Sequence, residues 1–561
     1  MAANDTDGHI LTIGSLDPLT DVYGGMFAAK SAIPEGGTAG QVLAKASDDD
    51  YDTEWVDAGS GGGDGGGGGG TTDGPEYDST TGEYSNSSIK AWLDAMEDGS
   101  SYGVSIPKSS TTDCTKLGAN ATIAAPTPGT EATAAVDPYT SIPTFFYCEV
   151  NATIDANGVY HVTGIQGDGR FARDGSNGNV WILTPVLYET FDASGSSAVT
   201  HYISKTQLNG MTAQPGASLP DGTLRPFILY PKYPLGEYNG SPSSVSGVPC
   251  RTFDVSHDTL ITICDTANSG SAGKSYADDW YVKTMFLMKY ATKDSQSVFK
   301  GCTDYNVSAS VTVAESNVKR VIVSATDAAK FVVGSAVQVG TSSATSRNAS
   351  NAYARITGIT SYNSSNSAIA LDLSANINTT TSMKVMTMPW FCGACDNVEG
   401  DGSPSDRTSG KEPFSIQGIE IAHGMYEILG DVILYSNGSS GEEICLNPDS
   451  RNEATSVTAN YTHTGKYLPN SGTAAGWMYP YYPNRAGGLF FGDGAGATQT
   501  TGMCDGSYCV AKSTSGSYEW QGLGNLNTPG HAGLWCVNGS NALSYANWTF
   551  GSRLSALGRK G

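Results

Sequence analysis

The stretch that decides the fold of this chain runs from Ser517 to Gly561 and reads SYEWQGLGNLNTPGHAGLWCVNGSNALSYANWTFGSRLSALGRKG. Apolar residues such as Leu543 and Phe550 alternate in it with short polar residues and with aromatic residues. Tyr, Ser, Gly and Asn are typical of binding loops, because Tyr offers contact area at low entropy cost and small polar side chains hydrogen-bond adaptably. Composition alone allows a binding surface or a structural bundle of Gly- and Asn-rich loops.

The chain before this stretch divides into segments of different pattern. Residues 387–561 are rich in Gly, Asn, Ser and aromatic residues, so many loop hydrogen bonds must satisfy their backbone. Residues 308–386 contain short β-branched runs, which predict a self-contained β module. Residues 74–222 are also β-like, with Asn- and Gly-containing turns between strands from about 140 to 205.

Two helices are expected. The sequence DDWYVKTMFLMKYATKD at 278–294 is apolar on more than one face, which predicts a buried helix capped by Asp278 or Asp279. A shorter helix is expected at 86–98, with Ser87 or Ser88 as its N-cap.

The N-terminal part combines a small hairpin with a linker. In residues 1–57, GGTAGQVLAKASDDDYDTEW from Gly36 to Trp55 predicts two short strands around an acidic turn. One hairpin is too small to be stable alone. Residues 58–73 contain a Gly-rich run. It is either a flexible linker that gives the following domains reach and freedom of orientation, or a tolerated low-complexity insertion. The first residues lack a basic start and an apolar core, so we expect no secretory signal.

Composition argues against several classes of partner. The formal net charge is -24 with scattered acids, which disfavours nucleic acid because phosphate contacts need Lys and Arg. No apolar run reaches membrane-spanning length, so we expect no membrane insertion. The 11 Cys are odd in number and scattered, so we expect mostly buried free thiols.

Motifs for catalysis or metal binding are weak. Gly99–Gly103 matches G-x-S-x-G but follows a helix, and Gly273-Lys274-Ser275 lacks the first Gly of a P-loop. The pairs Cys392/Cys395 and Cys504/Cys509 could supply four thiolates to zinc, although the spacing of the second pair is unusual and nothing in the sequence fixes the two pairs near each other. Paired carboxylates for glycoside hydrolysis leave no sequence sign. We therefore expect no catalytic residue, no metal and no cofactor.

Several stretches resemble a known family. Gly533–Asn538, Asn541–Ser544, Asn547-Trp548 and Gly551–Ser555 resemble the C-terminus of phage proteins that are diversified by retroelements. Phe414–Glu420 with Gly424–Glu427 is similar to that family's core strand pair, and Ala291–Ser297 to its helix end. The N-terminal hairpin resembles an element of phage tail fibres. In this family a reverse transcriptase rewrites adenines in Asn codons of a C-type-lectin-like domain.

The resemblance implies a division of the C-terminal residues into two groups. One group is the fold's framework: Trp520, Gly533, Leu534, Val537, Asn538, Asn541, Trp548, Gly551 and Arg553. The other group is the variable, ligand-facing set: Tyr518, Leu523, His531, Trp535, Cys536, Ser540, Tyr545 and Thr549. The fold is also similar to the formylglycine-generating enzymes, whose chemistry uses cysteines, so Cys504, Cys509 and Cys536 leave an enzyme as an alternative.

The resemblance implies a mainly β protein with some α (α+β), in which a C-type-lectin-like domain at 223–307 resumes at 387–561 after the inserted module. It implies a bacteriophage tail fibre protein, assembled in the host cytoplasm, that attaches the virion to a protein or glycan receptor on the host cell. The expected partners are other tail or baseplate proteins, through the N-terminus, and two further copies in a homotrimer. The alternatives are a structural baseplate or decoration protein and a tail-associated glycan depolymerase.

Overall fold

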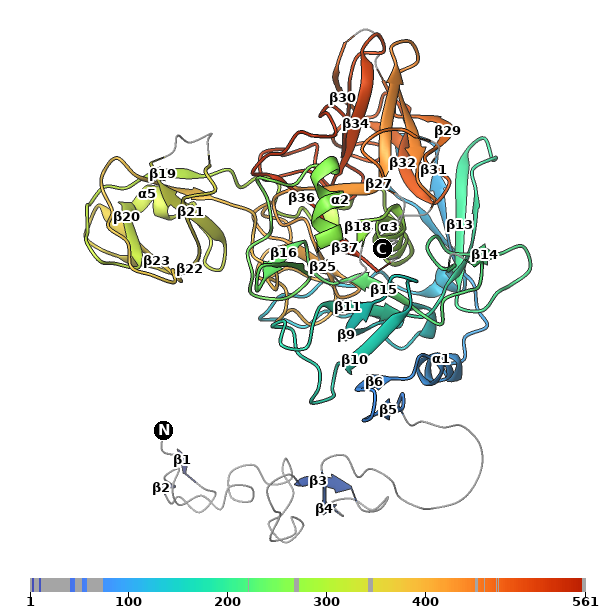
Figure 1. Cartoon of the computed structure of the whole chain (residues 1–561), viewed down its shortest axis with the longest axis horizontal. Helices are drawn as coiled ribbons and strands as arrows, with labels where there is room; N and C mark the ends of the chain where they lie inside the picture. The colour runs from blue at the N-terminus through green and yellow to red at the C-terminus, as the bar shows by residue number, and fades with distance from the viewer. Residues whose placement is uncertain are drawn as a thin grey trace. The chain divides into compact units, whose positions relative to one another are not determined.

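The computed structural model describes residues 74–556, apart from 220, 267–271, 342–346, 449–452, 459, 471 and 473, and the backbone of four short strands nearer the N-terminus. Strands make up 37% of the described residues and helices 10%, which confirms the mainly β class with some α (Figure 1). The chain divides into two compact units, Met1–Thr71 and Thr72–Gly561.

The first unit contains two strand pairs. Strands β1 (Ala3–Asn4) and β2 (Ile10–Leu11) pair antiparallel. Strands β3 (Gln41–Lys45) and β4 (Thr53–Asp57) also pair antiparallel, which confirms the predicted hairpin. The predicted linker at 58–73 lies outside the described residues.

The second unit begins with two sheets, built almost entirely from residues 77–231. The first sheet has six strands in the order β15-β11-β9-β10-β6-β5, and the second has five in the order β14-β12-β13-β7-β8. In the first sheet the strands are β5 (Tyr77–Asp78), β6 (Glu83–Tyr84), β9 (Cys148–Ile154), β10 (Tyr160–Ile165), β11 (Val180–Thr184) and β15 (Ile228–Pro231). In the second they are β7 (Tyr102–Pro107), β8 (Thr115–Gly118), β12 (Tyr188–Asp192), β13 (Ala198–Ser204) and β14 (Thr212–Ala213).

Both predicted helices are present, with different N-caps. Helix α1 (Asn86–Ala95) is capped by Ser85, whose hydroxyl accepts a hydrogen bond from the Ser88 N–H. Helix α3 (Tyr276–Tyr290) is capped by Ser275, which forms a capping box with Asp278 in the first turn. The predicted caps lie two to four residues too far along the chain, because several neighbouring residues have capping side chains. Helix α2 (His257–Thr266) was not predicted.

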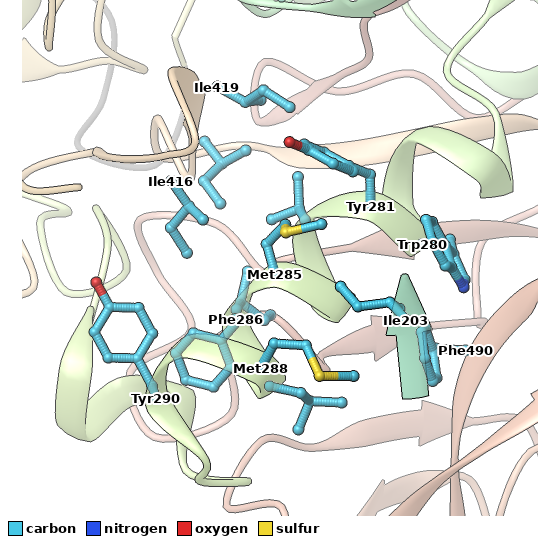
Figure 2. Close-up of a cluster of buried hydrophobic side chains, with 14 of the residues drawn as sticks. Ile203, Trp280, Tyr281, Met285, Phe286, Met288, Tyr290, Ile416, Ile419 and Phe490 are labelled. Atoms are coloured by element: carbon cyan, nitrogen blue, oxygen red, sulfur yellow. The ribbon is translucent and has the colours of Figure 1, made fainter. Parts of the chain in front are cut away.

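Helix α3 is the centre of the largest hydrophobic core. Its Trp280, Met285 and Phe286 are fully buried, and Figure 2 shows Ile203 of β13 and Phe490 beside the helix. This core contains side chains from residues before and after the domain boundary that was predicted between residues 222 and 223. Helices α4 (Ser295–Val298) and α5 (Ala325–Ala328) are short.

Residues 308–387 form a six-stranded sheet with a hydrophobic cluster of its own. Its order is β19-β24-β21-β22-β23-β20. The strands are β19 (Ser308–Ser310), β20 (Arg320–Ser324), β21 (Ala336–Gly340), β22 (Ala352–Ser361), β23 (Asn366–Leu371) and β24 (Lys384–Thr387). The guanidinium of Arg347 lies 4.2 Å from the ring centroid of Trp548, so this sheet contacts the C-terminal segment.

The C-terminal part is organised by an eight-stranded sheet with the path β29-β28-β27-β34-β35-β33-β30, to which β36 adds parallel to β27. Its strands are β27 (Tyr426–Asn437), β28 (Glu442–Leu446), β29 (Thr462–Tyr467), β30 (Gly476–Met478), β33 (Ser507–Cys509), β34 (Ser515–Gly522), β35 (Val537–Asn538) and β36 (Phe550–Gly551). Four further pairs are β16 (Gly236–Tyr238) with β17 (Ser241–Ser243), β18 (Ala272–Gly273) with β37 (Leu554–Ser555), β25 (Phe414–Ile416) with β26 (Ile419–Ile421), and β31 (Pro480–Ala486) with β32 (Leu489–Ala495).

Among the described residues, no helix has both the length and the apolar character needed to cross a membrane.

Candidate ligand-binding surface

Most of the predicted framework is buried. Arg553 is 1% exposed and forms a two-point ion pair with Glu427, with its Nε 2.8 Å from Oε2 and its Nη2 2.7 Å from Oε1. This pair joins the end of the chain to β27. Gly533 has a φ of 137°, and a Cβ there would lie 2.3 Å from the Asp505 carboxylate, so the position requires glycine. Trp520, Leu534, Val537 and Gly551 are also buried, whereas Asn538, Asn541 and Trp548 are partly exposed.

Five of the eight predicted ligand-facing side chains are buried, so the sequence prediction was wrong about their exposure. Trp535 packs edge-on against Phe490, and Cys536 is fully buried in another hydrophobic cluster. A position whose codon can be diversified by adenine changes can still have a buried side chain. Neighbouring residues of a loop alternate between the core and the solvent. The buried five are Tyr518, Leu523, Trp535, Cys536 and Thr549.

The partly exposed His531 belongs to a row of aromatic rings. Its imidazole stacks on Trp477 with centroids 4.3 Å apart, and on Tyr479 at 5.7 Å. Trp477 in turn meets Tyr508 edge-on at 5.3 Å. All four side chains are partly exposed. We call Trp477, Tyr479, Tyr508 and His531 the aromatic face.

The backbone fixes the positions of these rings. Trp477 and Tyr508 are paired residues of β30 and β33, so their side chains lie on the same side of the sheet. Gly506 lies beneath the indole, since a Cβ there would be 2.7 Å from Trp477 Cε3. Its N–H donates to the His531 carbonyl at 2.8 Å, which holds the loop carrying His531 against β33.

The buried Asp505 holds the loop that contains Trp535. Its carboxylate accepts hydrogen bonds from the Ser295 hydroxyl at 2.7 Å and from the Trp535 N–H at 3.0 Å. Burial raises the pKa of Asp505 to about 8, although these hydrogen bonds oppose the shift. Asp505 is therefore mostly neutral at pH 7.

The electrostatics of the aromatic face are those of neutral, amphipathic rings. Burial lowers the pKa of His531, so its ring is uncharged at neutral pH. The Tyr479 hydroxyl is 2.5 Å from His531 Nδ1 and 3.3 Å from the Gly530 carbonyl oxygen. Such a surface suits stacking against an apolar or sugar-ring face, with the polar ring atoms hydrogen-bonding at its rim.

Ser540 and Tyr545 are the other two predicted ligand-facing residues with exposed surface. Ser540 follows β35, where Asn538 pairs with Tyr508 and accepts a hydrogen bond from the Ser540 hydroxyl at 2.8 Å. It therefore lies one strand from the aromatic face. Tyr545 is 49% exposed and contacts Phe550 edge-on at 5.7 Å. No contact among the described residues places Tyr545 with the four rings.

The sequence prediction missed Trp477, Tyr479 and Tyr508. The first two lie in WMYPYY, from Trp477 to Tyr482, a dense run of aromatic residues in a Gly- and Ser-rich segment. That density was the available signal. Tyr508 gave no comparable signal, because its place beside Trp477 depends on strand pairing across about thirty residues.

The candidate catalytic and metal motifs are not assembled in the described part of the chain. Lys274 is buried, and its Nζ lies 2.9 Å from Glu427 Oε2. A P-loop lysine would instead be available to bind a phosphate. Cys392, Cys395, Cys504 and Cys509 do not converge on one point. Burial raises the pKa of the Cys504 thiol to about 12 and that of Cys536 well above its usual value, which makes both weak nucleophiles.

The prediction that the cysteines are mostly buried free thiols is confirmed, because all eleven are free thiols and most are buried. Among the described residues, the side chains with metal-ligating atoms that do lie close together are those of Glu443, Cys445 and His463. They lie at the edge of the eight-stranded sheet opposite to β30.

No protein-family model and no curated protein sequence matched the chain when it was compared with them.

Proposed function

We propose that this chain is the receptor-binding protein of a bacteriophage tail fibre and attaches the virion to the host cell through its C-terminal surface. The single observation that carries the proposal is the aromatic face: four partly exposed rings held in contact by strand pairing and by a buried framework. Rigid exposed aromatic side chains are the usual anchors of binding surfaces.

The sequence resemblance supports the rest of the proposal. Residues 223–307 and 387–561 form a C-type-lectin-like domain interrupted by the β module at 308–386, and its diversified positions include His531, Ser540 and Tyr545. The N-terminal hairpin joins other tail proteins. Binding is non-covalent and without turnover, and three copies in a fibre raise the avidity by effective concentration.

The test is binding of the fluorescently labelled full chain to a panel of bacterial strains, measured by flow cytometry. We expect saturable binding to some strains and at least about tenfold weaker binding for Trp477→Ala, because a central aromatic anchor contributes about 2 kcal/mol. Val159→Ala, another exposed apolar side chain on the β9–β10 turn, is the matched control.

Two results would favour the alternatives. Binding to no strain, by a chain that assembles into virions, would point to a structural baseplate or decoration protein. Loss of capsule after addition of the purified chain would point to a glycan depolymerase.

A further inference from the structure

Three side chains with metal-ligating atoms meet at the β28–β29 edge of the eight-stranded sheet. The Sγ atom of Cys445 lies 3.5 Å from His463 Nδ1, and the same nitrogen lies 2.9 Å from Glu443 Oε2. The three ligand atoms all lie within 4.8 Å of one another. No other group of three or more such residues converges in the described ranges.

The sheet geometry brings these residues together. Glu443 and Cys445 are two residues apart on β28, and His463 on β29 pairs directly with Cys445, so the three side chains share one face. A register shift between the Glu443 and Cys445 pairings brings the backbone N–H of Gly465 within 2.9 Å of Glu443 Oε1. The ring of Tyr435 packs edge-on against the imidazole at 5.5 Å and limits its rotation.

We propose that Glu443, Cys445 and His463 bind one zinc ion. A tetrahedral zinc with bonds of about 2.3 Å to sulfur and about 2.1 Å to nitrogen separates those two atoms by about 3.6 Å, close to the separation of Sγ and Nδ1. Glu443 keeps its Oε1 on the Gly465 N–H and offers Oε2 to the ion. A thiolate with an imidazole favours zinc over calcium or magnesium, which prefer oxygen ligands.

The fourth coordination position is open to solvent. The side chain of His463 is 50% exposed, and β29 is the edge strand of its sheet. Three protein ligands with a free position allow a water, or a carboxylate or imidazole from another molecule, to complete the shell. The ion joins the exposed β29 to β28, so its binding also stabilises this edge.

The same geometry disfavours a nucleophilic Cys–His–Glu relay. A relay needs the acid and the nucleophile on opposite ring nitrogens, so that a proton can pass through the imidazole. Here Cys445 and Glu443 both approach Nδ1 of His463. Convergence of three ligands on one point fits a cation and does not fit proton transfer.

The test uses the tag-free full chain, stripped of metal and titrated with Co²⁺ and then with Zn²⁺. We expect one Co²⁺ per chain with a thiolate-to-cobalt charge-transfer band, displaced by Zn²⁺. Cys445→Ser should abolish the band, and His463→Ala and Glu443→Gln should each weaken zinc binding at least about tenfold, in the range that loss of metal-site interactions produces.

The matched control is His161→Ala. His161 lies between Glu83 and Asp155, at 3.0 and 3.9 Å, with no cysteine ligand, so this variant should bind like the wild type. Zinc binding that is equal in the wild type, His463→Ala and Cys445→Ser would overturn the proposal, as would Co²⁺ binding without a charge-transfer band. Circular dichroism spectra check that each variant is folded, and the exposed His463→Ala is the variant least dependent on core packing.

Discussion

The imidazole of His531 lies almost parallel to the indole of Trp477, with the two planes 6° apart and the centroids separated by 4.3 Å. These residues are far apart in the sequence and come from a loop and from the edge strand β30. Because the stack is already formed in the free chain, a ligand would lose little side-chain entropy on binding to it.

The first prediction concerns Gly506, which lies beneath Trp477. In Gly506→Ala the new Cβ would stand 2.7 Å from the indole, so the ring must move and lose its contact with His531. We expect about fivefold weaker cell binding, since an aromatic pair contributes about 1 kcal/mol, and a changed near-ultraviolet circular dichroism spectrum. Gly476→Ala is the control on the adjacent strand, because no atom lies within 4 Å of its Cβ. Equal binding by both variants would contradict the role given to Trp477.

The second prediction concerns pH. Burial lowers the pKa of His531 from its ordinary 6.5, so the folded protein disfavours the charged ring. The contribution of His531 to folding stability is therefore complete above about pH 6.5 and declines as the pH falls below that value. We expect cell binding to stay constant from pH 8 to pH 7 and to weaken on further acidification, because the charged imidazole no longer accepts from the Tyr479 hydroxyl and is poorly solvated at its partly buried position. NMR titration of the histidine ring protons checks the pKa, and a midpoint above 6.5 would contradict the assignment.

The sequence predicted the fold better than the surface. The apolar pattern of 278–294 and the β-branched runs of 308–386 are local signals, and both elements are present. The exposure of Trp535 and Cys536 was predicted wrongly, because it depends on tertiary packing against Phe490 and the β27 region rather than on local pattern. The aromatic face was missed for the same reason, since the pairing of β30 with β33, which brings Trp477 beside Tyr508, cannot be inferred from either strand alone.

The third prediction concerns the buried pair of Arg553 and Glu427. Burial alone would raise the pKa of Glu427, but the charges of Arg553 and Lys274 outweigh it and lower the pKa to about 2. The pair's stabilisation is therefore present above about pH 4.5 and lost as the pH falls toward 2. We expect Glu427→Gln to destabilise the fold by about 3–5 kcal/mol in urea unfolding, because it removes the carboxylate paired with the buried Arg553 and leaves the buried Lys274 with Asp279 alone.

A surface pair supplies the comparison for this prediction. Lys90 and Asp94 form an exposed ion pair one helical turn apart on α1. Lys90→Met should change the free energy of unfolding by less than about 1 kcal/mol. Equal losses in Lys90→Met and Glu427→Gln would show that the Arg553 pair does not hold the C-terminal strand to β27.

The last prediction concerns Asp505, which supports the loop behind the aromatic face. Its pKa is raised to about 8 by burial, so the folded protein holds a proton that the unfolded chain releases near pH 4. The stability that this group contributes is complete below about pH 4 and is lost as the pH rises through 8, with a slope of at most about 1.4 kcal/mol per pH unit.

Asp505→Asn keeps an acceptor for the Ser295 hydroxyl and the Trp535 N–H but carries no charge. The variant should therefore gain stability relative to the wild type as the pH rises from 5 to 8, measured by urea unfolding at each pH. Asp94→Asn, at an exposed position, controls for the loss of one formal charge. If Asp505→Asn and the wild type change in parallel across this range, Asp505 is ionised in the folded protein and the loop must be anchored by a charge rather than by a neutral carboxyl group.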